Sequence, residues 1–161
     1  MLKRFVFVIL AFSLFAGTTL GAELLSTPDG KPRALAVGEL VKGPAQVKTT
    51  AGGMLYVSPD STLEVQAPEG ELELFLVKGG SVRGTIGKMS QVAVPTGWLT
   101  VTGEEQAKFY AETLAPKRGF VKVDEGQGIL IFKKLHVYLS EGNGIEIEEK
   151  ASGAVKFTTH Q

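Results

Sequence analysis

The feature that most constrains the fold is a short alternating strand pattern that recurs along the chain and is interrupted by glycine. Its clearest instance is Glu71–Gly84 (ELELFLVKGGSVRG), which begins with strict alternation of acidic and apolar residues. Successive side chains of a strand point to opposite faces. We therefore expect Leu72, Leu74 and Leu76 to share one buried face and the glutamates between them to face water.

Glycine and proline turn signals recur at roughly seven to ten residues, close to the spacing of all-β sandwiches and barrels. We expect Gly79-Gly80 to end one strand, because glycine adopts turn conformations at little cost. No part of the chain after residue 22 has the apolar period of a long helix. The predicted fold class is all-β, an antiparallel sandwich or a short solenoid-like stack of short strands. The predicted strands are Ala34–Leu40, Ala45–Thr49, Leu55–Val57, Thr62–Gln66, Glu71–Lys78, Ser81–Ile86, Gln91–Val94, Trp98–Thr102, Gln106–Thr113, Phe120–Val123, Gly128–Leu139, Ile145–Glu149 and Ala154–Thr158.

The first 22 residues have the three parts of a secretory signal. Lys3 and Arg4 form a charged start, Phe5–Phe15 is an apolar run, and small residues lead to a cleavage site after Ala22. A membrane-spanning helix needs about 20 apolar residues, and the run here is shorter. We expect a cleaved signal peptide (1–22) and a periplasmic or secreted protein. The alternative is an uncleaved anchor in the inner membrane.

The rest of the chain has the length of one domain. Residues 23–33 are turn-rich and are interpreted as a leader segment, and residues 34–158 as a single all-β domain. The apolar stretch Gly128–Leu139 is long for one strand, and we expect Lys133-Lys134 to bend or split it.

Composition excludes several functions. After removal of residues 1–22 the chain has 15 basic and 17 acidic residues, so it lacks the positive charge that nucleic-acid binding requires. It has no cysteine, and its two histidines, His136 and His160, are too few for a zinc site of about three protein ligands. We expect no cofactor, no metal site and no catalytic residues, hence a protein that is not an enzyme.

Two other functions remain open, one based on acidic pairs and one on free strand edges. Glu104-Glu105, Asp124-Glu125 and Glu146-x-Glu148 have the residue type used in glycoside hydrolysis or calcium binding. On strands, such charges more often solvate a surface and protect edges from aggregation. A glycan-active enzyme with a carboxylate pair is one alternative function, and a structural envelope protein that self-assembles through strand edges is the other.

Aromatic residues are the candidate partner-binding residues. Trp98 starts a strand and is either a platform for a protein or glycan or a plug of the core. Tyr56, Phe75, Tyr110 and Tyr138 lie off the Leu/Val face of their strands or at its edge. They form an exposed patch on one sheet face, unless both faces of these strands are covered.

Residues from about Gly38 to Ile131 resemble the FecR domain, a periplasmic all-β module. The likeness is carried by Leu55–Val65, by Leu72–Gly84, and by Val92–Phe109 followed by Val121–Ile129. These segments are similar to the family's ordered succession of strands, a proline-containing turn and glycines.

The resemblance implies a sensing or scaffolding module in bacterial envelope signalling. Members that regulate sigma factors carry a cytoplasmic segment before a membrane helix, whereas only Met1–Arg4 precedes the apolar run here. We therefore expect a stand-alone exported module whose partner is an envelope protein or a glycan. Nucleic acid is not an expected partner, and the membrane is one only if the N-terminal segment stays uncleaved.

Overall fold

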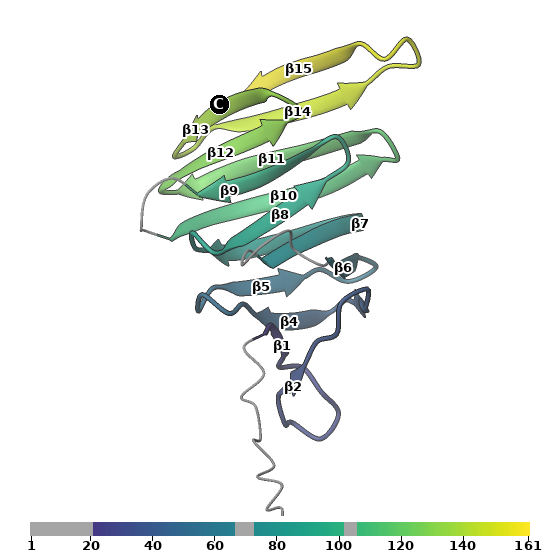
Figure 1. Cartoon of the computed structure of the whole chain (residues 1–161), viewed down its shortest axis with the longest axis vertical. Coiled ribbons are helices and arrows are strands. Elements are labelled where there is room, and N and C mark those ends of the chain that lie inside the picture. The colour runs from purple at the N-terminus through teal and green to yellow at the C-terminus, as the bar shows by residue number, and fades with distance from the viewer. Residues whose placement is uncertain (1–20, 67–72, 102–105) are drawn as a thin grey trace, which may run out of the picture.

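The computed structural model describes residues 21–66, 73–101 and 106–161 of the chain (Figure 1). Every regular element in these residues is a strand, fifteen in all, and the strands stack along the long axis of the molecule. The predicted all-β class is therefore confirmed.

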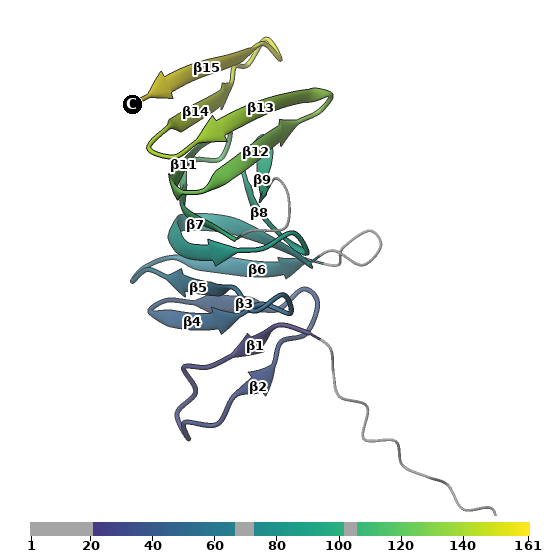
Figure 2. The same cartoon turned by 90° about the vertical axis from the view of Figure 1, so that its left-hand side faces the viewer.

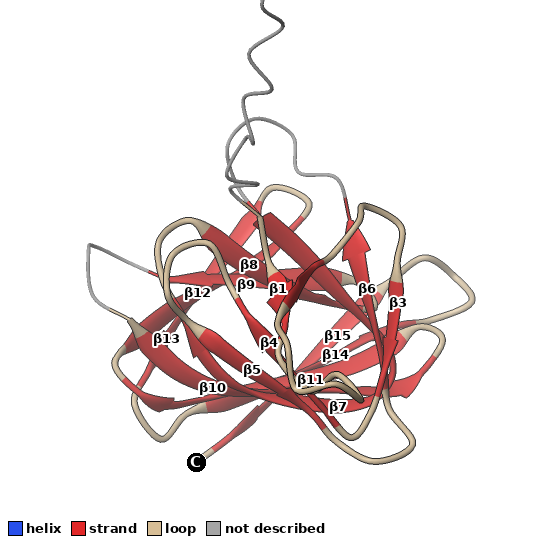
Figure 3. Ribbon diagram, turned by 90° about the horizontal axis from the view of Figure 1, so that it is seen from below, coloured by secondary structure: helices blue, strands red, loops and turns tan. Residues whose placement is uncertain are grey.

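The strands form two layers with the core between them, a sandwich seen along its long axis in Figure 3. All strand pairs are antiparallel except β7–β8. Sheet A has the order β2 (Arg33–Ala34), β1 (Glu23–Leu24), β4 (Ala45–Lys48), β5 (Met54–Val57), β7 (Glu73–Ile86), β10 (Ala107–Ala115), β11 (Arg118–Glu125), β14 (Gly144–Glu149) and β15 (Val155–His160). Sheet B has the order β3 (Leu40–Lys42), β6 (Thr62–Gln66), β7, β8 (Ser90–Val94), β9 (Gly97–Val101), β12 (Gln127–Phe132) and β13 (Leu135–Ser140).

Strand β7 belongs to both sheets and joins the two layers (Figure 2). Gly79 pairs with Thr62 in sheet B, whereas Gly80 pairs with Thr113 in sheet A. Gly80 has a φ of 69°, and a Cβ on it would lie 2.2 Å from the Oγ of Ser61. The prediction that Gly79-Gly80 ends the strand was wrong, because the glycines bend one long strand from one sheet into the other.

The predicted buried face of β7 was also wrong. Phe75 and Val77 are fully buried, whereas Leu74 and Leu76 are only partly buried. Phe75 lies between β6 and β8, directly opposite Val65 and Val92, and all three side chains point into the core. The segment is apolar on both faces here, so alternation alone did not determine which face is inside. Leu72, Glu71 and the start of the predicted strand lie outside the described residues.

The core contains buried side chains from both sheets. Its largest fully buried members come from β5, β6, β7, β9, β10, β12 and β14: Leu55, Leu63, Phe75, Ile86, Leu99, Phe109, Leu130, Ile145 and Ile147. Sequence alternation predicted most of these strands correctly. Thr62–Gln66 has the predicted bounds, and Gly128–Leu139 is divided at Lys133-Lys134 into β12 and β13, as expected.

The first two strands of the described chain, β1 and β2, extend sheet A beyond β4. Residues 23–33, interpreted as a leader, begin with β1, which pairs with both β2 and β4 of sheet A. Ala22, the residue before the predicted cleavage site, is buried, and its carbonyl oxygen accepts a 2.9 Å hydrogen bond from the Leu35 amide. The rest of the predicted signal peptide lies outside the described residues. Within the described ranges there is no helix long and apolar enough to cross a membrane.

Candidate partner-binding surfaces

The five predicted partner-binding residues do not form one patch. Tyr56, Trp98 and Tyr138 are 41%, 37% and 72% exposed, and Tyr110 is partly buried. Phe75 is fully buried, so its predicted place in an exposed patch was wrong. Tyr56 and Tyr110 lie on sheet A, whereas Trp98 and Tyr138 lie on sheet B, on the other side of the core.

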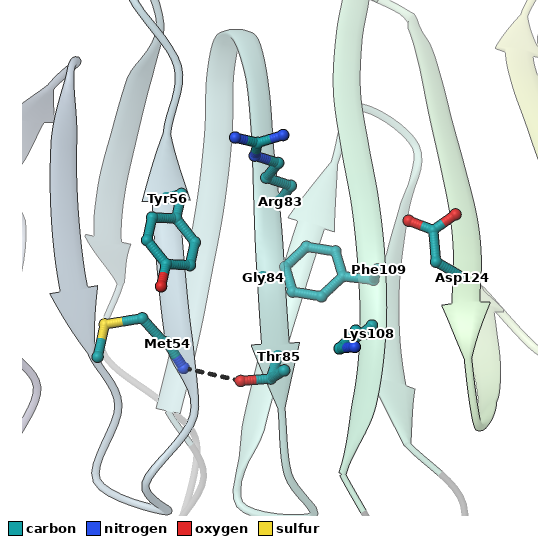
Figure 4. Close-up of a pocket in the computed structure, with 8 residues that line it drawn as sticks. All are labelled: Met54, Tyr56, Arg83, Gly84, Thr85, Lys108, Phe109 and Asp124. Atoms are coloured by element: carbon teal, nitrogen blue, oxygen red, sulfur yellow. Dashed lines mark hydrogen bonds between the residues drawn. The ribbon is translucent and has the colours of Figure 1, made fainter.

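The outer face of sheet A brings Tyr56 and Tyr110 to either side of an arginine. Arg83 on β7 lies directly opposite Tyr56 on β5 and directly opposite Tyr110 on β10. Directly opposed residues of antiparallel strands have Cβ atoms about 5 Å apart. We call these three residues the tyrosine–arginine row. Figure 4 shows Tyr56 and Arg83 on their neighbouring strands.

Two hollows meet at Tyr56 and Arg83, with volumes of about 390 Å³ and 410 Å³. The first is lined by Met54, Tyr56, Arg83, Gly84, Thr85, Lys108, Phe109 and Asp124 (Figure 4). The second is lined by Ser26, Pro44, Ala45, Gln46, Tyr56, Val57, Ser58, Pro59, Arg83 and Tyr110.

Gly84 allows β5 and β7 to approach closely in the floor of the first hollow. A Cβ on Gly84 would lie 1.9 Å from the carbonyl oxygen of Met54. The Met54 amide also donates a 3.0 Å hydrogen bond to the Thr85 hydroxyl. Phe109 is buried and lies directly opposite Gly84, and its ring lies beside this glycine (Figure 4).

Tyr110 is fixed by polar and aromatic neighbours. Its hydroxyl donates a 2.9 Å hydrogen bond to a carboxylate oxygen of Glu112. Partial burial raises the pKa of the Tyr110 phenol above its ordinary value, and the nearby Glu112 carboxylate adds to this effect. The phenol therefore remains neutral at neutral pH. The centroid of the Tyr110 ring lies 6.1 Å from the centroid of the Phe120 ring, and the Phe120 ring meets the His160 ring edge-on at a centroid distance of 5.4 Å.

Charges around the row are mostly paired. The Nζ atom of Lys108 lies 2.5 Å from Oε1 of Glu125, and the Nζ atom of Lys122 lies 3.1 Å from Oδ1 of Asp124. Within the described part of the chain, Arg83 has no ion pair or side-chain hydrogen bond. Arg83 was not identified from the sequence, because its position between two tyrosines depends on the pairing of three strands. The only local signal was a polar residue at an outward position of an alternating strand.

The outer face of sheet B carries apolar side chains around Trp98, with His136 opposite Ile131 and Thr100 opposite Ile129 as polar neighbours. Trp98 on β9 lies directly opposite Ile131 on β12. Ile129, also on β12, lies directly opposite Tyr138 on β13. Ile129 and Ile131 are partly buried, and Tyr138 is strongly exposed. We call Trp98, Ile129, Ile131 and Tyr138 the tryptophan face. Strands β9, β12 and β13 lie side by side in Figure 2.

The predicted polar candidates are at the surface. His136 is exposed at the sheet B edge strand, and the described residues contain no group of three or more His, Asp or Glu side chains placed to hold a metal ion. Glu146 forms an ion pair with Arg118, with 2.7 Å between the Glu146 Oε1 and the Arg118 Nε. Glu104-Glu105 lies outside the described residues.

Neither a protein-family model nor a curated protein matches this chain. Two crystal structures of a candidate anti-sigma factor from Parabacteroides distasonis ATCC 8503 have a similar fold, with TM-scores of 0.54 and 0.55 at 14% and 13% sequence identity. Each match covers 79% of this chain and 59% of the other. The chain therefore spans less than two thirds of the length of these proteins, and what it shares with them is the fold.

Proposed function

We propose that this protein is a non-enzymatic, FecR-like module of the bacterial cell envelope that binds a protein partner through the tryptophan face. The observation that carries the proposal is the exposed Trp98 beside Ile131, with Ile129 and Tyr138 extending the same apolar surface. Tryptophan and tyrosine are enriched among the residues that dominate binding energy in protein interfaces. Continuous exposed apolar surface on a folded domain marks interaction sites.

The chemistry of this face favours a protein over a glycan as the partner. Ile129 and Ile131 offer aliphatic surface, and their neighbours Trp98 and Tyr138 offer large rings. The polar side chains directly opposite the two isoleucines are only Thr100 and His136. A protein partner buries such a surface with apolar side chains of its own. A glycan, in contrast, requires many hydrogen bonds to its hydroxyl groups.

The fold shared with a candidate anti-sigma factor supports a sensing or regulatory role. The role proposed for this chain is that of the envelope module alone, because the chain spans only part of those proteins. The signal-like residues 1–22 support export of the module to the periplasm.

Affinity capture from an envelope extract tests the partner face. Wild-type protein, Trp98→Ala and Tyr56→Ala serve as baits; the third removes an exposed ring from the opposite face. We expect a specific protein that is captured by wild type and Tyr56→Ala and lost with Trp98→Ala, while thermal unfolding shows all three baits folded. Equal capture by all three baits, or loss with Tyr56→Ala alone, contradicts the proposal.

Export is tested on the protein produced in its own cells. We expect it in the periplasmic fraction, with an intact mass that corresponds to a chain beginning at Glu23. Recovery of the full-length chain from the membrane fraction would support the uncleaved anchor instead.

A further inference from the structure

We propose that Arg83 anchors a second binding site, for the carboxylate group of a uronic-acid sugar. The site consists of the tyrosine–arginine row and the two hollows that meet there. It lies on sheet A, across the core from the tryptophan face, and does not depend on the function proposed for that face.

The charge of Arg83 is available to a ligand. Lys108 and Lys122, the neighbouring cations on the same face, are each paired with an acid, Glu125 and Asp124 respectively. Arg83 has no such partner among the residues the structure describes. A guanidinium group presents two parallel N–H donors that fit the two oxygens of a carboxylate.

The number of free charges favours a carboxylate over a phosphate. One free guanidinium balances the single negative charge of a carboxylate. A phosphate monoester carries a charge of about −1.5 to −2 at neutral pH and would lack a second cation.

The surroundings of Arg83 suit a sugar ring. Tyr56 and Tyr110 provide aromatic surface on both sides of the guanidinium, against which the C–H groups of a pyranose can pack. The second hollow adds the polar side chains of Gln46 and Ser58. Each hollow has a volume within the range of small-molecule sites, about 300–1,000 Å³.

The position of the row within the sheet argues against a peptide that binds as an added strand. Strand β7 is paired with β5 on one side and β10 on the other at this level, so its backbone groups are already used. Strand addition requires a free sheet edge. A compact ligand that contacts only side chains fits a hollow in the middle of a sheet.

Titration of the purified protein with the methyl glycoside of galacturonate, which carries one carboxylate, tests the site by calorimetry or NMR. Its methyl ester is the matched probe, because it has the same ring without the charge. We expect binding of the acid only. Arg83→Gln should weaken binding about tenfold or more, and Arg83→Lys should restore only part of it. Lys156→Gln, which removes another exposed cation from the outer face of sheet A, should have no effect.

Several outcomes overturn the proposal. Equal binding of the acid and the ester would show that the carboxylate is not recognised. Equal binding of inorganic phosphate or acetate would reduce the site to a general anion site. Unchanged affinity in Arg83→Gln, or no binding of the acid sugar to wild type, would show that Arg83 does not anchor a uronate.

Discussion

Tyr56 and Trp98 project from opposite layers of the sandwich, Tyr56 from β5 of sheet A and Trp98 from β9 of sheet B. Both side chains are exposed, and the apolar core separates them. Substitutions that are far apart and share no contacts act independently. Truncation of either residue should therefore leave binding at the other face unchanged.

The first prediction concerns the buried face of β7. Phe75→Ala should lower the free energy of unfolding by about 3–5 kcal/mol, because it removes a fully buried ring and leaves a cavity. Leu74→Ala, at the adjacent partly buried position, should cost clearly less. Urea denaturation of both variants measures the difference. A larger loss for Leu74→Ala would reverse the assignment of the two faces.

The second prediction uses the two adjacent glycines at the bend of β7. Gly80→Ala should destabilise the fold by about 1–3 kcal/mol, because the residue has a positive φ and its Cβ would lie 2.2 Å from the Ser61 Oγ. Gly79→Ala is the control, because a Cβ there meets nothing within 4 Å. It should change stability by about 0.5 kcal/mol or less. Equal effects in thermal unfolding would contradict a tight bend at Gly80.

The third prediction concerns acid stability. The Arg118 guanidinium donates a 2.7 Å hydrogen bond to Glu146 and lowers the pKa of that carboxyl below its ordinary value of 4.5. A carboxyl with a lower pKa in the folded state stabilises the protein above its unfolded pKa and loses this effect as the pH falls through the folded pKa. Glu146→Gln should therefore melt below wild type at pH 7, and the difference should shrink well below pH 4.5.

Arg118→Gln is the matched variant for this pair. It should reproduce the same trend, because it removes the hydrogen bond that holds the pKa of Glu146 down. A difference between wild type and Glu146→Gln that stays constant across the pH range would exclude the ion pair as the cause.

The fourth prediction uses Trp98 as an intrinsic probe, since it is the one tryptophan of the sequence. Its side chain is 37% exposed, so acrylamide should quench its fluorescence in the folded protein, although less strongly than in the unfolded chain. Binding of a protein partner to the tryptophan face should shift the emission to the blue and reduce quenching. Quenching as weak as that of a core tryptophan would contradict the exposure of this face.

Alternation and turn residues predicted the strands well where one face of a strand is polar. The bounds of Thr62–Gln66 and the division at Lys133-Lys134 both followed from local residues. The prediction was wrong at Phe75, because the residues around it are apolar on both faces and only pairing with β6 and β8 determines which face is buried. Gly79-Gly80 was predicted as a strand end because glycine permits a turn and a bend equally well.

The all-β class was determined by the sequence itself, because a two-residue period of apolar side chains is a local property of the chain. The grouping of the aromatic residues was decided only by the tertiary structure. Long-range pairing placed Tyr56 and Tyr110 beside Arg83, buried Phe75, and directed Trp98 and Tyr138 to the opposite side. The physical reason is that the neighbours of a strand residue across the sheet come from distant parts of the chain, and their register depends on how the whole core packs.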